Sequence, residues 1–220
     1  MQWEPLLLSF EVATVATIAS LVLGVAAGLL LARPRFWGRE LWGALLTAPM
    51  VLPPTVLGYF LLVWLGRQSG IGKFYEQLTG QPIVFTFLGA TIAAALGSLP
   101  LVVRAARVAF EQIDPALISA ARTLGATPAR TFWRIKLPLA SRGIASGTVL
   151  GFVRALGDFG ATLMVAGNIP HQTRTAALAI YDATESGRGA EAAGMIAVLT
   201  ALAIFVSMAA VPLSRSSDGR

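Results

Sequence analysis

Cysteine is absent from this sequence, histidine occurs once, and only 13% of the residues carry a charge. Without cysteine the chain can form neither disulfides nor thiolate metal sites. The lone histidine, His171, has no paired acids or nucleophile in a catalytic pattern around it. The ATP-binding pattern G-x-x-x-x-G-K-[ST] is also missing, so ATP hydrolysis by that route is excluded. We therefore expect no catalytic residue, no metal site and no cofactor bound by this chain.

The sequence is instead rich in apolar residues, which make up 55% of the chain and give it a mean hydropathy of +0.71. Five apolar runs approach the ~20 residues that a helix needs to cross a bilayer. They cover residues 6–31, 44–65, 83–103, 144–166 and 192–212. A soluble bundle would show polar faces on its outer helices, and these runs show none. The sequence predicts an all-α integral membrane protein, a single transmembrane domain over residues 1–220 with five spans.

The basic residues are unevenly distributed between the two sides that five spans define. One side holds only four, and Arg154 lies inside a span. The other side holds twelve of the 17: Arg33, Arg35, Arg39, Arg104, Arg107, Arg122, Arg130, Arg134, Lys136, Arg142, Arg215 and Arg220. An excess of Lys and Arg marks the cytoplasmic side. We expect a bacterial cytoplasmic (inner) membrane protein with its N-terminus outside and its C-terminus inside, and no nucleic-acid partner.

Proline and glycine interrupt two of the runs. Pro49, Pro53 and Pro54 require the 44–65 run to bend or break, either as a packing kink or as an element that lines a path. In the 144–166 region, glycines at positions 143, 147 and 151 allow another helix to approach closely. That stripe is interpreted as packing within one subunit or, alternatively, as a dimer seam.

Arg154 and Asp158 are spaced i, i+4 inside the fourth run. A lone charge within a membrane is costly, so we expect the two side chains to pair or to reach water. A structural ion pair is favoured over a gate or path role.

Residues 111–139 form the longest cytoplasmic loop, and they contain two helix start signals. Asp114-Pro115 and Thr127-Pro128 each place a capping side chain before a proline. The first helix is expected to end near Leu124, where Gly125 supplies a stop, and the second to end at Lys136 before Pro138. On the second helix, positions 130 and 134 share one face, while positions 132 and 135 point the other way. An amphipathic helix lying on anionic lipid is the alternative, but two capped helices meeting at a glycine favour a protein partner.

This loop resembles the EAA loop of ABC importer permeases, whose pattern is E-A-A, three residues, G, nine residues and I-x-L-P. Ala120, Ala121 and Gly125 match it, and the sequence Ile135-Lys136-Leu137-Pro138 closes it. Ser119 stands where the family usually has glutamate. In that family the second short helix docks in a groove of the ATPase subunit. The resemblance implies that the ATPase-coupling residues are Ser119, Ala120, Ala121, Gly125, Thr127, Pro128, Arg130, Phe132, Arg134, Ile135, Leu137 and Pro138.

Four longer stretches resemble the molybdate-type permeases of ABC importers: residues 46–72, 99–126, 154–170 and 173–182. The resemblance implies a type I importer permease fold and a pore formed by two copies of the chain. Two ATPase subunits that bind ATP and Mg²⁺ and an extracytoplasmic molybdate-binding protein would complete the transporter. The path or gate would involve Pro53, Pro54, Arg154 and Asp158. Asn168, Thr173 and Arg174 would contact the binding protein, unless they form an ordinary solvated loop.

Other functions remain open at the level of sequence. The resemblance extends to sulfate-type permeases, and tungstate is a further candidate anion. A secondary transporter would be expected to show inverted repeats and more intramembrane ionisable groups. A membrane scaffold is compatible with the composition. Co-purification of an ATPase subunit would distinguish the ABC permease from these last two.

Overall fold

The computed structural model describes residues 3–33 and 38–214, with side chains described as far as residue 209. Arg35, Arg215 and Arg220, which contributed to the predicted orientation, lie outside the described residues. Within the described ranges the regular structure is entirely helical. The helices are α1 Glu4–Leu31, α2 Arg39–Val51, α3 Pro54–Leu65, α4 Gly70–Thr79, α5 Phe87–Glu111, α6 Pro115–Thr123, α7 Pro128–Thr131, the π-helix η1 Phe132–Lys136, α8 Leu137–Leu156, α9 Gly160–Ala166, α10 Ala176–Glu185 and α11 Gly189–Ser214.

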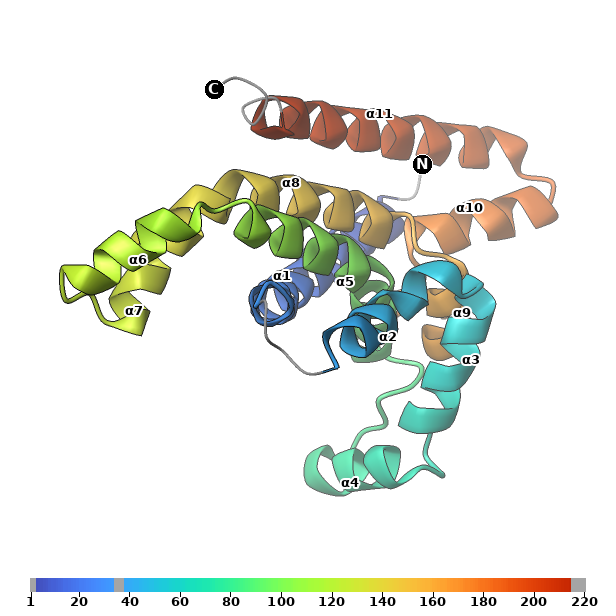
Figure 1. Ribbon diagram of the computed structural model, residues 1–220. Helices are drawn as coiled ribbons and strands as arrows, with labels where there is room; N and C mark the ends of the chain where they lie inside the picture. Colours follow the sequence, from blue (N-terminus) through green and yellow to red (C-terminus); the bar gives the residue numbers. More distant parts are fainter. Residues whose placement is uncertain (1–2, 34–37, 215–220) are drawn as a thin grey trace.

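The centre of the protein is the packing of α1, α5 and α8 against one another (Figure 1). Small residues allow these backbones to approach closely. Helices within a membrane associate through such close packing, because the hydrophobic effect does not drive them together there. A Cβ added to Gly28 of α1 would lie 2.6 Å from that of Ala106, and one on Gly147 of α8 would lie 2.2 Å from that of Ala105. The glycine stripe of α8 therefore packs on α5 within the subunit.

Two helix pairs are sharply bent. α2 and α3 meet at 111° around Leu52 and Pro53, which confirms the predicted interruption of the 44–65 run. α8 and α9 meet at 60°. The predicted fourth span, 144–166, is therefore divided between two helices, because residues 157–159 leave the helix. In the part of the chain that the structure describes, three helices are long and apolar enough to cross a membrane, or up to five spans result if each bent pair counts as one.

The ends of the elements differ from several predicted boundaries. α5 starts at Phe87 rather than at residue 83, because Thr86 caps it by accepting a hydrogen bond from the Gly89 amide. α4 occupies the segment between α3 and α5, and its N-cap Ser69 accepts a hydrogen bond from the Gly72 amide at 2.8 Å. The short helix α10 was not predicted, since its ten residues are too few to give a spanning signal.

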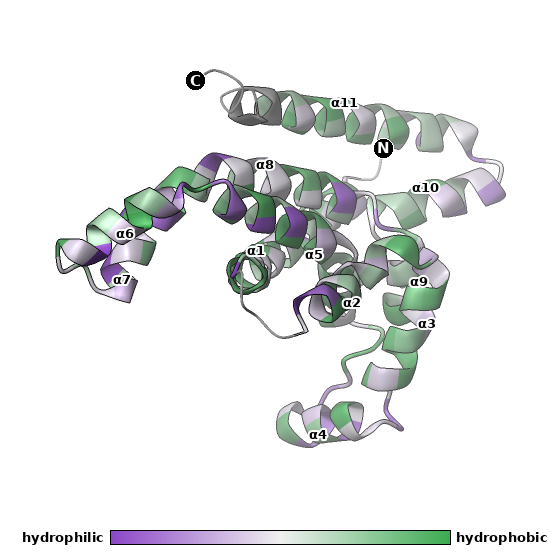
Figure 2. Ribbon diagram, viewed as in Figure 1, coloured by the Kyte–Doolittle hydropathy of each residue, from purple (hydrophilic) through white to green (hydrophobic). Residues whose placement is uncertain are grey.

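The outer helices carry their apolar side chains on the surface. Only 11% of the spanning window of α11 is buried, and Phe205 and Met208 are exposed. Figure 2 shows hydrophobic residues along both α11 and α3. An exposed apolar surface of this extent indicates contact with lipid or with another chain. α6 and α7 project beyond the ends of α5 and α8 (Figure 1).

The second helix of loop 111–139 does not end where the sequence predicted. Pro138 lies in the first turn of α8, and the chain stays helical from Pro128 to Leu156. The π-helical turn explains this, because the Leu137 amide donates to the carbonyl of Phe132, five residues earlier. Pro138 has no backbone N–H to donate to the preceding turn. The wider π turn changes the hydrogen-bond register before it, so the helix continues through Pro138 instead of ending there.

Candidate functional site

The corner of loop 111–139 is fixed by hydrogen bonds between its own residues. Asp114 accepts from the Ala116 amide at 2.8 Å, and Thr127 accepts from the Arg130 amide at 3.3 Å. Gly125 has a φ of 79°, the left-handed conformation that glycine adopts without a steric cost. Both predicted caps and the glycine stop are therefore confirmed.

The end of α6 is a complete Schellman motif. The Ala126 amide donates to the carbonyl of Ala121 at 2.9 Å, and the Gly125 amide donates to that of Arg122 at 2.9 Å. These two bonds satisfy carbonyls that the helix end would otherwise leave open. Loop 111–139 thus holds its shape by local bonds, before any partner is present.

Phe132 faces inward, unlike the arginines on either side of it. Its ring lies 6.5 Å from that of Phe110 and packs on the cluster that joins α5 to α8. Trp133, which no sequence pattern singled out, is instead 66% exposed. The faces predicted from i, i+4 spacing are thus observed, with Arg130 and Arg134 exposed and Phe132 and Ile135 half-buried.

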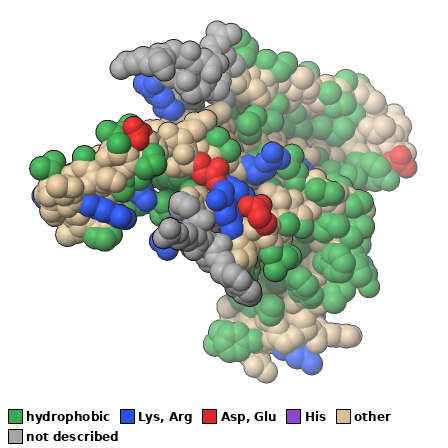
Figure 3. All heavy atoms as spheres, viewed as in Figure 1, with side chains coloured by type: hydrophobic (Ala, Val, Ile, Leu, Met, Phe, Trp, Pro, Cys, Tyr) green, Lys and Arg blue, Asp and Glu red, His purple; other side chains and the backbone are tan. Residues whose placement is uncertain are grey.

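An exposed surface on the loop combines cations with large apolar side chains. Arg130 and Arg134 are exposed, as is Leu124 at 87%, directly before the glycine corner. Figure 3 shows basic side chains gathered on this projecting part of the molecule. We call Leu124, Arg130, Trp133 and Arg134 the loop surface.

The remaining members of the predicted set support this surface. Ser119 donates to the Pro115 carbonyl at 3.0 Å, within its own helix. Ala121 is buried. The rest are distributed between surface and interior: Ala120, Thr127, Pro128 and Pro138 are exposed, and Ile135 and Leu137 are half-buried.

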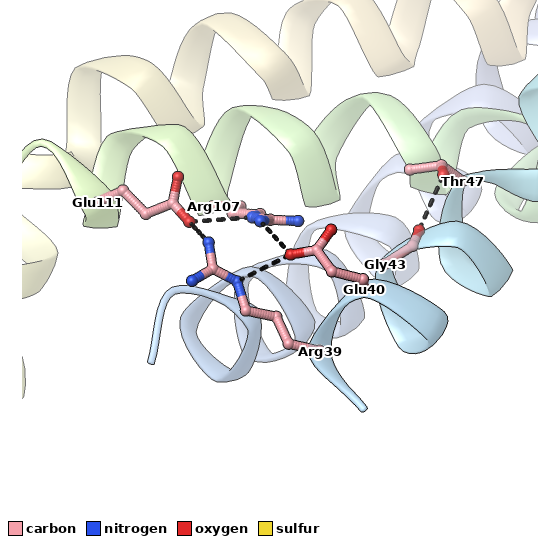
Figure 4. A network of polar contacts seen from close by, with 6 residues as sticks. All are labelled: Arg39, Glu40, Gly43, Thr47, Arg107 and Glu111. Carbon is pink, nitrogen blue, oxygen red and sulfur yellow. Dashed lines mark hydrogen bonds and ion pairs between the residues drawn. The ribbon is translucent and has the colours of Figure 1, made fainter. Parts of the chain in front are cut away.

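Charged residues behind the loop form a separate network between α2 and α5 (Figure 4). Glu111 accepts from Arg107 at 3.0 Å and pairs with Arg39. Glu40 lies 3.6 Å from Arg39 and 3.5 Å from Arg107. These two arginines were predicted only as markers of the cytoplasmic side. Their charges are balanced by acids, and they tie the start of α2 to the end of α5.

Arg154 and Asp158 form the predicted ion pair, with Nη1 and Oδ1 3.0 Å apart. Asp158 is 3% exposed, and its second oxygen accepts from the amide and the hydroxyl of Thr162 at 3.0 and 2.7 Å. The carboxylate therefore joins the end of α8 to the first turn of α9 across the bend. The ion pair and the caps together satisfy a charge that would otherwise be costly in a membrane.

The two bent pairs touch each other close to this ion pair. A Cβ added to Gly160 would lie 3.0 Å from the Cβ of Pro54, and one on Gly58 would lie 3.0 Å from the Cα of Ala161. Pro53 and Pro54 are exposed on their other side. The structure thus brings two predicted groups together, the prolines of one bend and Arg154 with Asp158 of the other.

The loop between α9 and α10 holds the last predicted group. Arg174 donates to Asn168 at 2.9 Å, and Nη1 of Arg174 lies 3.7 Å from Asp182. Thr173 is 1% exposed, and its hydroxyl accepts from the Ile169 amide at 3.1 Å. Thr173 therefore fixes the turn, while Asn168 and Arg174 are partly accessible.

Comparison with known proteins agrees with this arrangement. The sequence profile of the family described as "Binding-protein-dependent transport system inner membrane component" matches residues 21–215. The "Molybdenum transport system permease protein ModB" of Escherichia coli (strain K12) is 41% identical over 223 residues, covering 100% of this chain and 97% of that protein. The protein of the same name from Haemophilus influenzae is 42% identical and covers 97% and 92%.

A solved structure shares the fold. It is described as "Inward facing conformations of the MetNI methionine ABC transporter: CY5 native crystal form", and it matches with a TM-score of 0.72 at 19% identity. The match covers 97% of this chain and 93% of that one. At this level of identity the likeness concerns the fold alone, and it agrees with the predicted importer permease fold. The chain therefore belongs to the family of binding-protein-dependent transport system inner membrane components, the permease subunits of ABC importers.

Proposed function

We propose that this chain carries molybdate across the inner membrane, as the permease subunit of an ATP-driven importer. The observation that carries the proposal is the 41% identity to a molybdenum transport permease over the full length of the chain. Tungstate and sulfate are the competing anions, since they share the tetrahedral dianionic form.

The chain is a multi-pass inner-membrane protein, and permeases of its family work with ATPase and substrate-binding subunits. The finer arrangement belongs to the proposal. Two copies pair around a central path, two ATPase subunits that hold ATP and Mg²⁺ dock on the cytoplasmic side, and a molybdate-binding protein docks outside. The N-terminus is outside and the C-terminus inside.

The loop surface is the site proposed for ATPase docking. Leu124 and Trp133 lie outside the apolar spans and are largely exposed, so lipid does not cover them as it covers the spans. A groove on a partner protein would bury the apolar surface of these two side chains. Arg130 and Arg134 beside them can pair with acids on the same partner. The Schellman corner supports this role because a rigid element transmits the partner's displacement better than a flexible loop does.

The path is proposed to pass the meeting point of the two bends. Pro53 and Pro54 interrupt one span and Asp158 stabilises the interruption of the other, while Asn168 and Arg174 face the binding protein outside. Specificity for the anion would be set mainly by that binding protein. The permease needs only donors that pass a dianion onward.

Uptake of labelled molybdate tests this function. Cells lacking the gene are compared with cells in which it is restored, at nanomolar molybdate and in excess sulfate. Restored uptake that sulfate does not suppress supports molybdate. Suppression by sulfate would move the chain to the sulfate-type permeases, and suppression by tungstate alone would leave molybdate and tungstate as joint substrates.

A further inference from the structure

A pocket on the loop side of the molecule contains cations that the proposed transport cycle does not use. It encloses about 660 Å³ between the end of α1, the end of α5 and the helices of loop 111–139. Arg33, Arg122 and Lys136 line it, and each comes from a different element: the residue after α1's cap, the last turn of α6, and the end of η1. We call these three residues and the space between them the basic pocket.

The three cations have no acid to balance them among the residues that the structure describes. The one carboxylate that lines the pocket is Glu111, and it is already shared by Arg39 and Arg107. In the described part of the chain, no carboxylate lies within ion-pair distance of Arg33, Arg122 or Lys136. Figure 4 shows the neighbouring network, where each arginine does have a carboxylate partner. Because no carboxylate among the described residues balances these cations, the basic pocket is suited to an anion from outside the chain.

The like charges affect one another. Burial, followed by the positive charges of Arg122 and then Arg33, lowers the pKa of Lys136. Lys136 is half-buried, whereas Arg33 and Arg122 are exposed. Placing two more cations beside a half-buried ammonium group is unfavourable unless an anion compensates them. The fold nevertheless holds them together through rigid elements, since Arg122 lies in the Schellman turn and Lys136 in the π turn.

The walls of the pocket distinguish between anions. Beside the cations, Leu29, Phe110, Ile118 and Phe132 supply an apolar lining. The pocket also lies directly beyond the last apolar turn of α1, where Leu30 is 39% exposed. A soluble anion would use the cations and leave the apolar wall empty. A phosphodiester attached to acyl chains would use both.

We infer that the basic pocket binds the headgroup phosphate of an anionic phospholipid of the cytoplasmic leaflet. Arg33, Arg122 and Lys136 contact the phosphate, and the glycerol and upper acyl chains lie against the apolar wall. Basic pockets between helices on the cytoplasmic side are suited to such headgroups. A lipid bound there would connect α1 to both helices of loop 111–139. The inference rests on the proposed function only for the side of the membrane on which the loop lies.

Lipid retention tests the site without any transport step. The full chain is reconstituted in nanodiscs with equal parts of phosphatidylglycerol and phosphatidylcholine, re-extracted in mild detergent, and analysed by native mass spectrometry. We expect preferential retention of phosphatidylglycerol, reduced roughly tenfold in the double variant Arg122→Gln/Lys136→Gln. The matched control is Arg130→Gln/Arg134→Gln, which removes the same charge from the same loop outside the pocket and should retain lipid within about twofold of the unmodified chain.

A second arm identifies the source of the phosphate. The chain in pure phosphatidylcholine nanodiscs is titrated with inorganic phosphate at constant ionic strength, and its melting temperature is followed. Stabilisation that the double variant abolishes, without preferential phosphatidylglycerol retention, would assign the pocket to a soluble anion and overturn the lipid inference. Equal retention in the two double variants would overturn it too.

A single variant separates lost binding from misfolding. Arg33→Gln should melt near the temperature of the unmodified chain and still retain less phosphatidylglycerol, because it removes one of the three cations without disturbing either turn of the loop. Unchanged retention in this well-folded variant would remove Arg33 from the site. Because no uptake is measured, failure here leaves the molybdate proposal untouched, and the reverse also holds.

Discussion

At the scale of single residues, the carboxylate of Asp158 has partners on both sides of a break between two helices, Arg154 before it and Thr162 after it. Sequence spacing predicted its pairing with Arg154, because two residues four apart on a helix are neighbours. The bonds to Thr162 depend instead on a new helix, α9, that begins between the two residues, and the apolar run did not reveal this break. The residue therefore fixes a bend as well as balancing a charge.

Asp158→Asn should destabilise the chain, because an amide accepts less strongly and leaves Arg154 without a counter-charge. We expect a loss of about 1–3 kcal/mol, at the lower end because the Arg154 side chain is 36% exposed and partly screened by water. Thermal unfolding in detergent measures this, with Thr162→Val as the comparison that keeps the ion pair. If Asp158→Asn melts like the unmodified chain but abolishes uptake, the carboxylate acts in the path rather than in the fold.

Lys136 gives the stability of the chain a dependence on pH. Burial, then Arg122 and Arg33, lower its pKa below the ordinary 10.5. Between that lowered pKa and 10.5 the unfolded chain binds more protons, so the free energy of unfolding should rise with pH there. Lys136 lies in the loop, outside the predicted span 144–166. In neutral lipid, the melting temperature of Lys136→Gln should exceed that of the unmodified chain at pH values below this interval. Across the interval, the melting temperature of the variant should change less with pH than that of the unmodified chain. The same slope of melting temperature against pH in both chains would contradict the prediction.

At the scale of elements, local signals in the sequence predicted what local bonds determine. Asp114, Thr127 and Gly125 act within a few residues of themselves, so the caps and the corner could be identified in advance. The face that spacing assigned to Arg130 and Arg134 is exposed, and Phe132 and Ile135 on the other face are half-buried, as predicted. The exposure of Trp133 was not predicted, because no residue type signals a π turn. The stop predicted at Pro138 was wrong for the same reason.

The corner of loop 111–139 can be tested through backbone strain alone. Nothing lies within 4 Å of a Cβ added to Gly125, so Gly125→Val introduces no clash and acts only through its φ of 79°. We expect a cost of about 1–2 kcal/mol and reduced co-purification of the ATPase subunit. Gly125→Asn is the control, since asparagine tolerates this conformation, and it should co-purify normally. Equal ATPase recovery with both variants would count against a coupling role for the corner.

The seam between α5 and α8 can be tested by exchanging one methyl group. Gly147→Ala would place its Cβ 2.2 Å from that of Ala105, and we expect overpacking to cost about 1–3 kcal/mol. Adding Ala105→Gly returns the space, so the double variant should recover most of the melting temperature. Gly70→Ala, where the surroundings are open, should change little. No recovery in the double variant would place the strain elsewhere.

At the scale of the whole molecule, composition predicted the helical membrane class, but it could not predict how the spans bend. Among the described residues, three helices are long enough to cross unbroken and two pairs are interrupted, the second by residues 157–159 inside a predominantly apolar run. Hydropathy averages over ~19 residues, so a break of three is invisible to it. The meeting of Gly160 with Pro54 was harder still to predict, because the two residues are far apart in the sequence.

Orientation can be measured directly because the chain has no cysteine of its own. Single cysteines are introduced at Gln77 in α4 and at Gln112 after α5, both exposed. A membrane-impermeant maleimide should label Gln77→Cys in intact cells and Gln112→Cys only after permeabilisation, as an outside N-terminus requires. Labelling in the opposite order would invert the proposed topology and place loop 111–139 where no ATPase can reach it.

The contact between the two bends reduces the mechanical freedom of the protein. Two separate kinks would give two independent hinges, each able to open without the other. Because Gly160 of one bend packs directly against the ring of Pro54 in the other, neither bend can straighten without displacing the other. We therefore expect the pair to behave as one hinge with one degree of freedom. Any larger side chain at position 160 would push the two halves apart and let each move alone.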